Sequence, residues 1–190
     1  MEFKVNTIET APEGSVDTLR DVKKAFGFLP NMIGVLAESP QAAEAYTKIS
    51  DLFDATSLTA TEKQIVLLAA SVENECAYCI AAHTVISGLQ KVSKDVVDAV
   101  REGKAFEDPK LEALRRYTAE ITRNRGFASE DATKQFFEAG YDAKNALEVV
   151  LGITQKTLSN YVNHVAETPL DPQFEAAKWD PAGEQAANAF

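Results

Sequence analysis

Hydrophobic and polar positions along the chain repeat with the three-to-four-residue period of an α-helix, and no stretch shows the alternation of a strand. Most apolar stripes begin at a capping residue or a proline, and several end at a glycine, as helices in folded proteins do. The pattern therefore predicts an all-α fold of about eight or nine helices. They cover residues 15–26, 30–36, 40–53, 59–72, 77–89, 93–101, 109–125, 129–138 and 142–165.

One of these helices is predicted to be central. The run Ile65 to Val72 is apolar all round, which indicates burial on several sides. The next helix follows after only three residues, 73–75, so the two are expected to be antiparallel neighbours. The helix 142–165 is also rich in apolar residues, which predicts either a core helix or a subunit contact. The central pair of helices, 59–72 and 77–89, is apolar all round in a modest domain, which favours a homo-oligomer.

Length and composition limit the classes of function. A chain of 190 residues, 45% hydrophobic and 25% charged, can bury a core as one domain, 1–190. We expect a helical core over about 15–166 and a C-terminal extension over 167–190, ending in a surface segment 183–190. A net charge of −10 excludes a phosphate-backbone partner, so we expect no nucleic acid. No leader or membrane-length apolar run is apparent, which favours a cytoplasmic protein with no membrane partner.

The candidate chemistry lies in Asn-Glu-Cys-Ala-Tyr-Cys-Ile-Ala-Ala-His, residues 74–83, which holds both cysteines of the chain. On a helix, Cys76, Cys79 and His83 share one face. With Asn74 as the expected N-cap, the thiols would lie near the positive end of the helix dipole, which favours the reactive thiolate. His83, one turn after Cys79, is placed to take the thiol proton or to pair with the thiolate. Two closely spaced cysteines favour a redox or metal role over a structural disulfide.

At these residues the chain resembles the alkylhydroperoxidase D-like, or carboxymuconolactone decarboxylase-like, superfamily. The Cys-x-x-Cys-x-x-x-His motif follows a Leu-Thr-x-x-Glu-x-x-Ile-Val-Leu segment, and the similarity is dense over 58–88. The resemblance implies that Cys79 is oxidised by peroxide, that Cys76 resolves it as a disulfide, and that His83 belongs to a proton relay. It also implies a trimer or hexamer. Members that decarboxylate a muconolactone lack the cysteine pair, so that activity is not expected here.

Two positions depart from the family's pattern. A glutamate is common twelve residues before the first cysteine, where this chain has Gln64, and a histidine often precedes the second cysteine, where it has Tyr78. An amide cannot shuttle a proton as a carboxylate does. Glu62 is the other acidic candidate for the relay, but Thr59-x-x-Glu62 has the form of a capping box, which favours a structural role for Glu62 over a catalytic one.

The sequence thus predicts a cysteine-based oxidoreductase, a thiol peroxidase or disulfide reductase, with a small hydroperoxide as substrate and an external dithiol as reductant. No flavin, nicotinamide or haem motif is present, so no cofactor is expected. Two alternatives stay open. Cys76, Cys79, His83 and His164 would make a Cys₂His₂ zinc set if the last helix returned to the motif. The chain would otherwise be a helical interaction protein with inert thiols.

Overall fold

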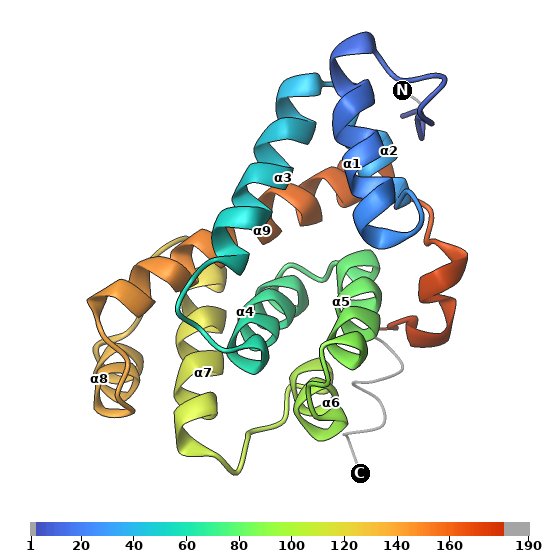
Figure 1. Cartoon of the computed structure of the whole chain (residues 1–190). Coiled ribbons are helices and arrows are strands. Elements are labelled where there is room, and N and C mark those ends of the chain that lie inside the picture. The colour runs from blue at the N-terminus through green and yellow to red at the C-terminus, as the bar shows by residue number, and fades with distance from the viewer. Residues whose placement is uncertain (1–2, 181–190) are drawn as a thin grey trace.

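The computed structural model describes residues 3–180, and in that range the chain is helical with no strand (Figure 1). The all-α prediction is confirmed. None of the helices in this range combines the length and apolar character needed to cross a bilayer. The α-helices are α1 Val16–Phe26, α2 Asn31–Leu36, α3 Pro40–Asp54, α4 Ala60–Glu73, α5 Ala77–Leu89, α6 Lys94–Arg101, α7 Pro109–Arg123, α8 Glu130–Glu138 and α9 Ala143–Ala166, with two short 3₁₀ helices, η1 Glu13–Ser15 and η2 Pro172–Ala177.

Local capping chemistry explains most of the boundaries. The Thr59–Glu62 capping box is formed at the start of α4, and Gly27 ends α1 with a φ of 79° that suits glycine. The prediction of Asn74 as the cap of α5 is wrong. Asn74 closes α4 instead, the chain turns at Glu75 with a φ of 53°, and the N-cap of α5 is Cys76.

Helix α4 lies at the centre of the lower group of helices (Figure 1). It packs against α5, α6, α7 and α9, and its Ile65 and Val66 are fully buried. Burial on several sides explains why its sequence is apolar all round, as predicted. Its antiparallel neighbour α5 follows after the short turn at 74–76, so the start of α5 lies beside the end of α4.

Helix α9 runs between α1–α3 and the lower helices, and contacts α2, α3, α4, α5 and α7 (Figure 1). Gly152 makes this crossing close. A Cβ atom there would lie 2.6 Å from the Phe53 ring and 2.7 Å from a Val66 methyl carbon. Because this glycine presents no side chain, α9 approaches α3 and α4 closely, and the following turn of α9 lies over the start of α5.

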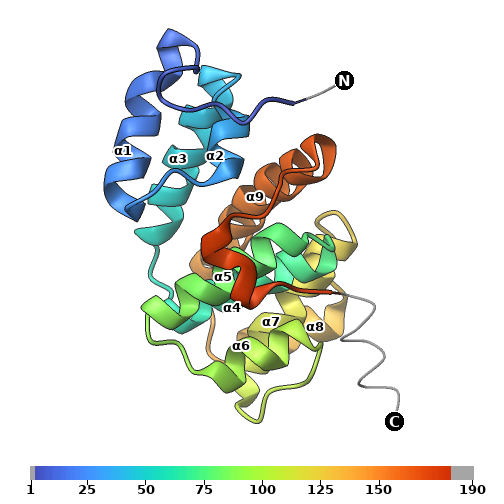
Figure 2. The same cartoon turned by 90° about the vertical axis from the view of Figure 1, so that its right-hand side faces the viewer.

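The segment after α9 packs against the helices (Figure 2). Its 3₁₀ helix η2 lies on α5, where the Phe174 ring meets the Tyr78 ring edge-on with the centroids 6.0 Å apart. Trp179 is also buried. The predicted extension therefore forms one wall over the cysteine helix as far as residue 180. The predicted surface segment 183–190 lies outside the described residues.

Candidate functional site

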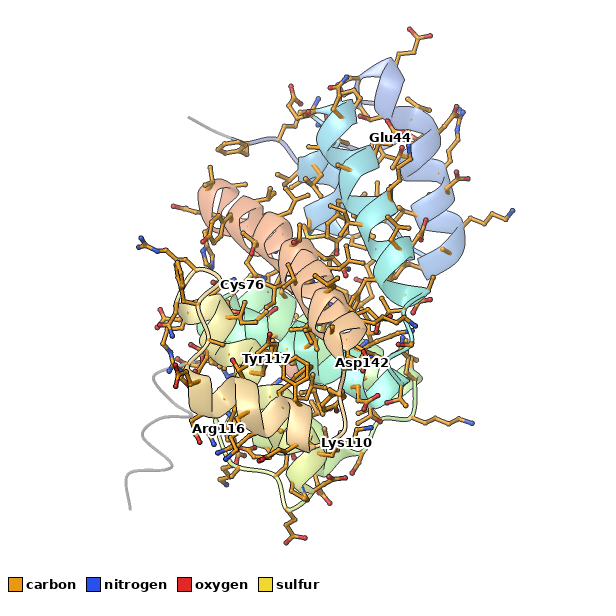
Figure 3. The ribbon with its side chains drawn as sticks, turned by 90° about the vertical axis from the view of Figure 1, so that its left-hand side faces the viewer. Glu44, Cys76, Lys110, Arg116, Tyr117 and Asp142 are labelled. Atoms are coloured by element: carbon orange, nitrogen blue, oxygen red, sulfur yellow. The ribbon has the colours of Figure 1, made fainter. Side chains whose placement is uncertain are left out.

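Both cysteines are buried free thiols at the start of α5. Cys76 is the N-cap and Cys79 is the third residue of the helix, so only Cys79 belongs to its first turn. Asn163 on α9 reaches both: its Nδ2 lies 3.3 Å from the Cys79 sulfur and 3.7 Å from the Cys76 sulfur. Figure 3 shows Cys76 in the interior beside α9. The two thiols are therefore held together under one polar side chain.

The two thiols have opposite acidities. The hydrogen bond that Cys76 donates to the Cys79 sulfur is the largest influence on Cys79, and it lowers the pKa of Cys79 to about 5 although burial opposes it. The positive charge of Lys156 and a hydrogen bond with Ser159 act in the same direction as the bond from Cys76. The same bond, with burial, raises the pKa of Cys76 above its ordinary range. Cys79 is therefore the thiolate, and Cys76 is the thiol that stabilises it.

These acidities predict the pH dependence of alkylation. The thiolate is the reactive form, so Cys79 should react with iodoacetamide at a constant rate above about pH 6 and lose reactivity as the pH falls through about 5. An ordinary cysteine would already lose reactivity below about pH 8.5. Cys76 should stay unmodified to pH 9. Peptide mass spectrometry after timed labelling measures the extent of alkylation at Cys76 and at Cys79. A Cys79 inflection near pH 8.5 would contradict the assignment.

A chain of hydrogen bonds leads from α4 to α9 beside the thiols. Lys156 Nζ lies 2.7 Å from His83 Nε2, and His83 Nδ1 lies 3.0 Å from Gln64 Oε1. A lysine ammonium only donates, so Nε2 accepts and Nδ1 carries the proton that Gln64 receives. Burial, and then the charge of Lys156, lower the pKa of His83, so the imidazole is neutral. Gln64 is thus an acceptor that fixes the tautomer of His83.

Lys156 carries the positive charge of this cluster. Burial lowers its pKa, but Tyr46, Cys79 and Cys76 outweigh burial, and the net shift of the pKa is upward. The ammonium therefore stays protonated. Both ring nitrogens of His83 are engaged, one by Lys156 and one by Gln64. The role of His83 as the base for the Cys79 proton, expected from the sequence, stays a prediction.

The other sequence candidates lie outside this cluster. Glu62 accepts hydrogen bonds from the Thr59 backbone and from the Tyr141 hydroxyl, at 2.8 and 2.9 Å, which is the structural role expected of it. Tyr78 donates to an Asp171 carboxylate oxygen at 2.5 Å, and so links α5 to the C-terminal segment. Lys110, which pairs with Glu62, lies well apart from Cys76 (Figure 3).

The zinc alternative finds no support in the described residues. His164 is exposed in the last turn of α9, and the Nε2 atom of His83 already accepts a hydrogen bond from Lys156. Within residues 3–180, no three histidine, cysteine, aspartate or glutamate side chains are grouped to hold a metal ion. The fourth ligand that a Cys₂His₂ site requires is therefore not brought to the cysteines.

A cavity of about 550 Å³ gives access to the thiolate. Its walls come from α1–α5, α9 and η2, and several of its side chains are aromatic. Cys79, His83 and Lys156 all line it, and Cys76 does not. The cavity is large enough for a small organic molecule. A ligand in it would meet Cys79 first, with Cys76 behind.

Sequence reasoning missed the contribution of α9. Lys156, Ser159 and Asn163 lie on the buried side of this helix and contact His83 or the thiols. They recur at the helical spacing of three and four residues, so a polar stripe was visible in the sequence. The apolar residues of the same helix masked it, because they were expected to face either the core or another subunit. Several instead face outward, among them Leu147, Val150, Tyr161 and Val165.

Comparison with known proteins supports the resemblance. Residues 40–120 match the model of the carboxymuconolactone decarboxylase family. Curated proteins gave no match. The crystal structure of the alkylhydroperoxidase AhpD core of a peroxidase-related protein from Ralstonia eutropha JMP134 is similar with a TM-score of 0.79 at 21% identity, covering 91% of this chain and 93% of that chain.

Two further structures show the same fold. The debrominase Bmp8 in its apo form is similar with a TM-score of 0.78 at 18% identity, covering 92% of this chain and 95% of that chain. The crystal structure of a peroxidase-related protein from Silicibacter sp. TM1040 is similar with a TM-score of 0.76 at 13% identity, covering 92% of each chain. The AhpD-like fold predicted from the sequence is therefore confirmed. Proteins with this fold are named for more than one reaction.

Proposed function

We propose that this chain, which has the AhpD-like fold and matches the carboxymuconolactone decarboxylase family over residues 40–120, is a thiol-dependent peroxidase. The observation that carries the proposal is the pairing of a thiolate with a thiol: Cys79, with its pKa lowered to about 5, lines the cavity and accepts a hydrogen bond from Cys76. A nucleophilic sulfur with a second thiol behind it is the arrangement that two-cysteine peroxide reduction requires.

The catalytic cycle follows from that arrangement. The Cys79 thiolate attacks the terminal oxygen of a hydroperoxide ROOH, which breaks the O–O bond and leaves Cys79 as a sulfenic acid with RO⁻ departing. RO⁻ takes a proton to become the alcohol. The Cys76 thiol then displaces the hydroxyl of the sulfenic acid, giving a Cys76–Cys79 disulfide and water. An external dithiol reduces this disulfide by exchange, which suits a protein in the reducing cytoplasm.

Consumption of an organic hydroperoxide by the reduced protein tests this function. With cumene hydroperoxide and excess dithiothreitol, we expect turnover that continues well beyond one equivalent per chain, above the rate of the dithiol alone. Boiled protein gives the background rate. Folded protein with two titratable thiols and no consumption above that background would contradict the proposal.

A second candidate is the reductive dehalogenation of an aromatic ring. It is favoured by the aromatic residues that line the cavity beside Cys79, including Phe26, Phe53 and Phe174, and one structure with this fold is a debrominase. The same thiol pair supplies the electrons: a bromoarene and two thiols give the arene, a disulfide and HBr. Release of bromide from a bromopyrrole without hydroperoxide turnover would favour this reaction over the first.

We also propose that the protein assembles with copies of itself through the outer face of α9. The face carries Tyr161 and Val165, 56% and 68% exposed, and borders an apolar groove of about 870 Å³. A helix that buries a polar stripe and exposes an apolar one is more favourable when the exposed stripe is covered. The expected trimer or hexamer would use this face.

Light scattering coupled to gel filtration measures the assembly. We expect an oligomer at micromolar concentration, and a shift toward the monomer mass when Tyr161 and Val165 are both changed to glutamate. The control is Leu89→Glu, at an even more exposed apolar residue at the end of α5 that does not line the groove. A monomer in the unmodified protein, or dissociation caused equally by Leu89→Glu, would contradict the proposed interface.

A further inference from the structure

Lys156 is a buried charge beside the Cys79 thiolate. Its side chain is 1% exposed on the inner face of α9, and no ion pair joins it to a carboxylate in the part of the chain that the structure describes. A buried ammonium without a carboxylate partner is costly, and a hydrophobic residue of the same size would often be as stable or more so. A buried cation of this kind, in a cavity with a reactive thiol, indicates a chemical role.

Its surroundings hold the ammonium in a defined place. One N–H bond is directed to His83 Nε2 at 2.7 Å, and His83 is itself fixed by Gln64 at 3.0 Å. Gln64 is held in turn, since its Nε2 donates to Gln90 Oε1 at 3.0 Å. Hydrogen bonds thus connect Gln64 on α4, His83 on α5 and Lys156 on α9. The ammonium has three N–H bonds, and Tyr46 is a second hydrogen-bond partner, so one N–H bond remains after His83 and Tyr46.

Lys156 and Cys79 line the same cavity. The groups that raise the pKa of the ammonium are Tyr46 and the two thiols, and of the two thiols Cys79 is the one whose pKa is lowered. The reduced site is therefore a thiolate and an ammonium that face one space and neutralise each other. A molecule that enters this space meets a nucleophile and a proton donor together.

We propose that Lys156 is the general acid of the Cys79 reaction and donates a proton to the leaving oxygen of the hydroperoxide. This inference rests on the proposed peroxidase function. When the thiolate attacks the terminal oxygen, negative charge develops on the other oxygen as the O–O bond breaks, and an alkoxide is a poor leaving group in water-excluded surroundings. Transfer of a proton from Lys156 Nζ converts it to the neutral alcohol.

Charge and atoms balance without another reactant. Cys79–S⁻, Lys156–NH₃⁺ and ROOH become Cys79–SOH, neutral Lys156–NH₂ and ROH. The thiolate that neutralised the ammonium disappears in the same step in which the ammonium gives up its charge, so no unpaired charge is left buried. The neutral amine can then take the proton of Cys76, activate it for attack on the sulfenic acid, and return that proton to the departing hydroxide as water.

Gln155 supplies a hydrogen-bond acceptor for the O–H group of a hydroperoxide in the cavity. Its Nε2 donates to Ser50 Oγ at 3.1 Å, while its buried Oε1 has no hydrogen-bond partner among the described residues, although Gln155 lines the cavity next to Lys156. A buried acceptor without a donor is costly until a ligand supplies one. The O–H of a hydroperoxide is such a donor, which would leave the second oxygen toward Lys156.

The test compares leaving groups of different basicity. tert-Butyl hydroperoxide releases a strongly basic alkoxide that needs a proton, whereas peracetic acid releases acetate, which does not. We expect Lys156→Met to lower kcat/KM for tert-butyl hydroperoxide by about 10²–10⁴-fold. The kcat/KM for peracetic acid should fall by less than about tenfold. Both kcat/KM values are first divided by the fraction of Cys79 present as thiolate, which iodoacetamide labelling gives.

The controls separate this role from others. Lys144→Met, on the exposed side of the same helix, should leave both rates unchanged. Lys156→Gln replaces Lys156→Met if the latter unfolds at a lower temperature than the unmodified protein. An equal loss with both peroxides would mean that Lys156 only maintains the thiolate, and no loss with either would also overturn the proposal. If the unmodified protein consumes neither peroxide, the peroxidase function itself fails.

Discussion

Replacement of Cys79 with serine is expected to abolish hydroperoxide consumption, with a loss of at least about a thousandfold in turnover. Cys79 is the thiol that lines the cavity and the one with the lowered pKa. A serine hydroxyl has no comparable anion at neutral pH, and Cys76 cannot substitute because its thiol does not line the cavity and its pKa is raised. Steady-state consumption of cumene hydroperoxide with excess dithiol measures the loss.

Folding must be shown to be intact for this result to be interpreted. The exchange of sulfur for oxygen at Cys79 removes little volume, so the thermal unfolding temperature should move by only a few degrees. Ile80→Val, on the same helix and equally buried but outside the lining of the cavity, is the matched control for a small change in the α5 core. Turnover that survives Cys79→Ser would show that another group attacks the peroxide.

Replacement of Cys76 with serine is expected to turn a catalyst into a reagent that acts once. Cys79 should still attack and consume about one equivalent of hydroperoxide per chain, and then stop as a sulfenic acid because no second thiol is present to displace its hydroxyl. Serine is the informative choice because its hydroxyl can keep a hydrogen bond to the Cys79 sulfur. Stoichiometric peroxide assays, with dimedone trapping of the sulfenic acid, measure the single turnover.

The same variant also tests the order of attack. If Cys76→Ser reacted with no peroxide while Cys79→Ser consumed one equivalent, the cysteine before the helix would be the nucleophile, as in a thioredoxin-like order. The structure favours the opposite order because the hydrogen bond from Cys76 and the ammonium of Lys156 both stabilise a negative Cys79.

Most helix boundaries could be predicted from the sequence because they are set by local chemistry. The capping box at Thr59 and the glycine at position 27 act on residues within four positions. The start of α4 and the end of α1 therefore lie where expected. The cap at Asn74 could not be predicted in this way. Asn74 bonds to Asn160 of α9 at 3.0 Å, and that contact depends on how two helices meet.

The site could be predicted only as far as α5 and one residue of α4. Cys76, Cys79 and His83 follow from the motif, and Gln64 from its alignment with the family's glutamate; the structure brings all four together. Lys156 comes 73 residues after His83, and its position depends on the close crossing of α9 at Gly152. No local pattern contains that information. The catalytic roles of these residues, like the single domain over 1–190, stay predictions.

If Cys76 and Cys79 form a two-electron redox pair, mass spectrometry of the reduced protein after one equivalent of hydroperoxide will detect it most directly. We expect the mass to fall by about two hydrogens, both thiols to become inaccessible to alkylation, and one peptide to carry a Cys76–Cys79 disulfide that dithiothreitol removes. A protein that keeps both thiols and leaves the peroxide unconsumed would contradict the account.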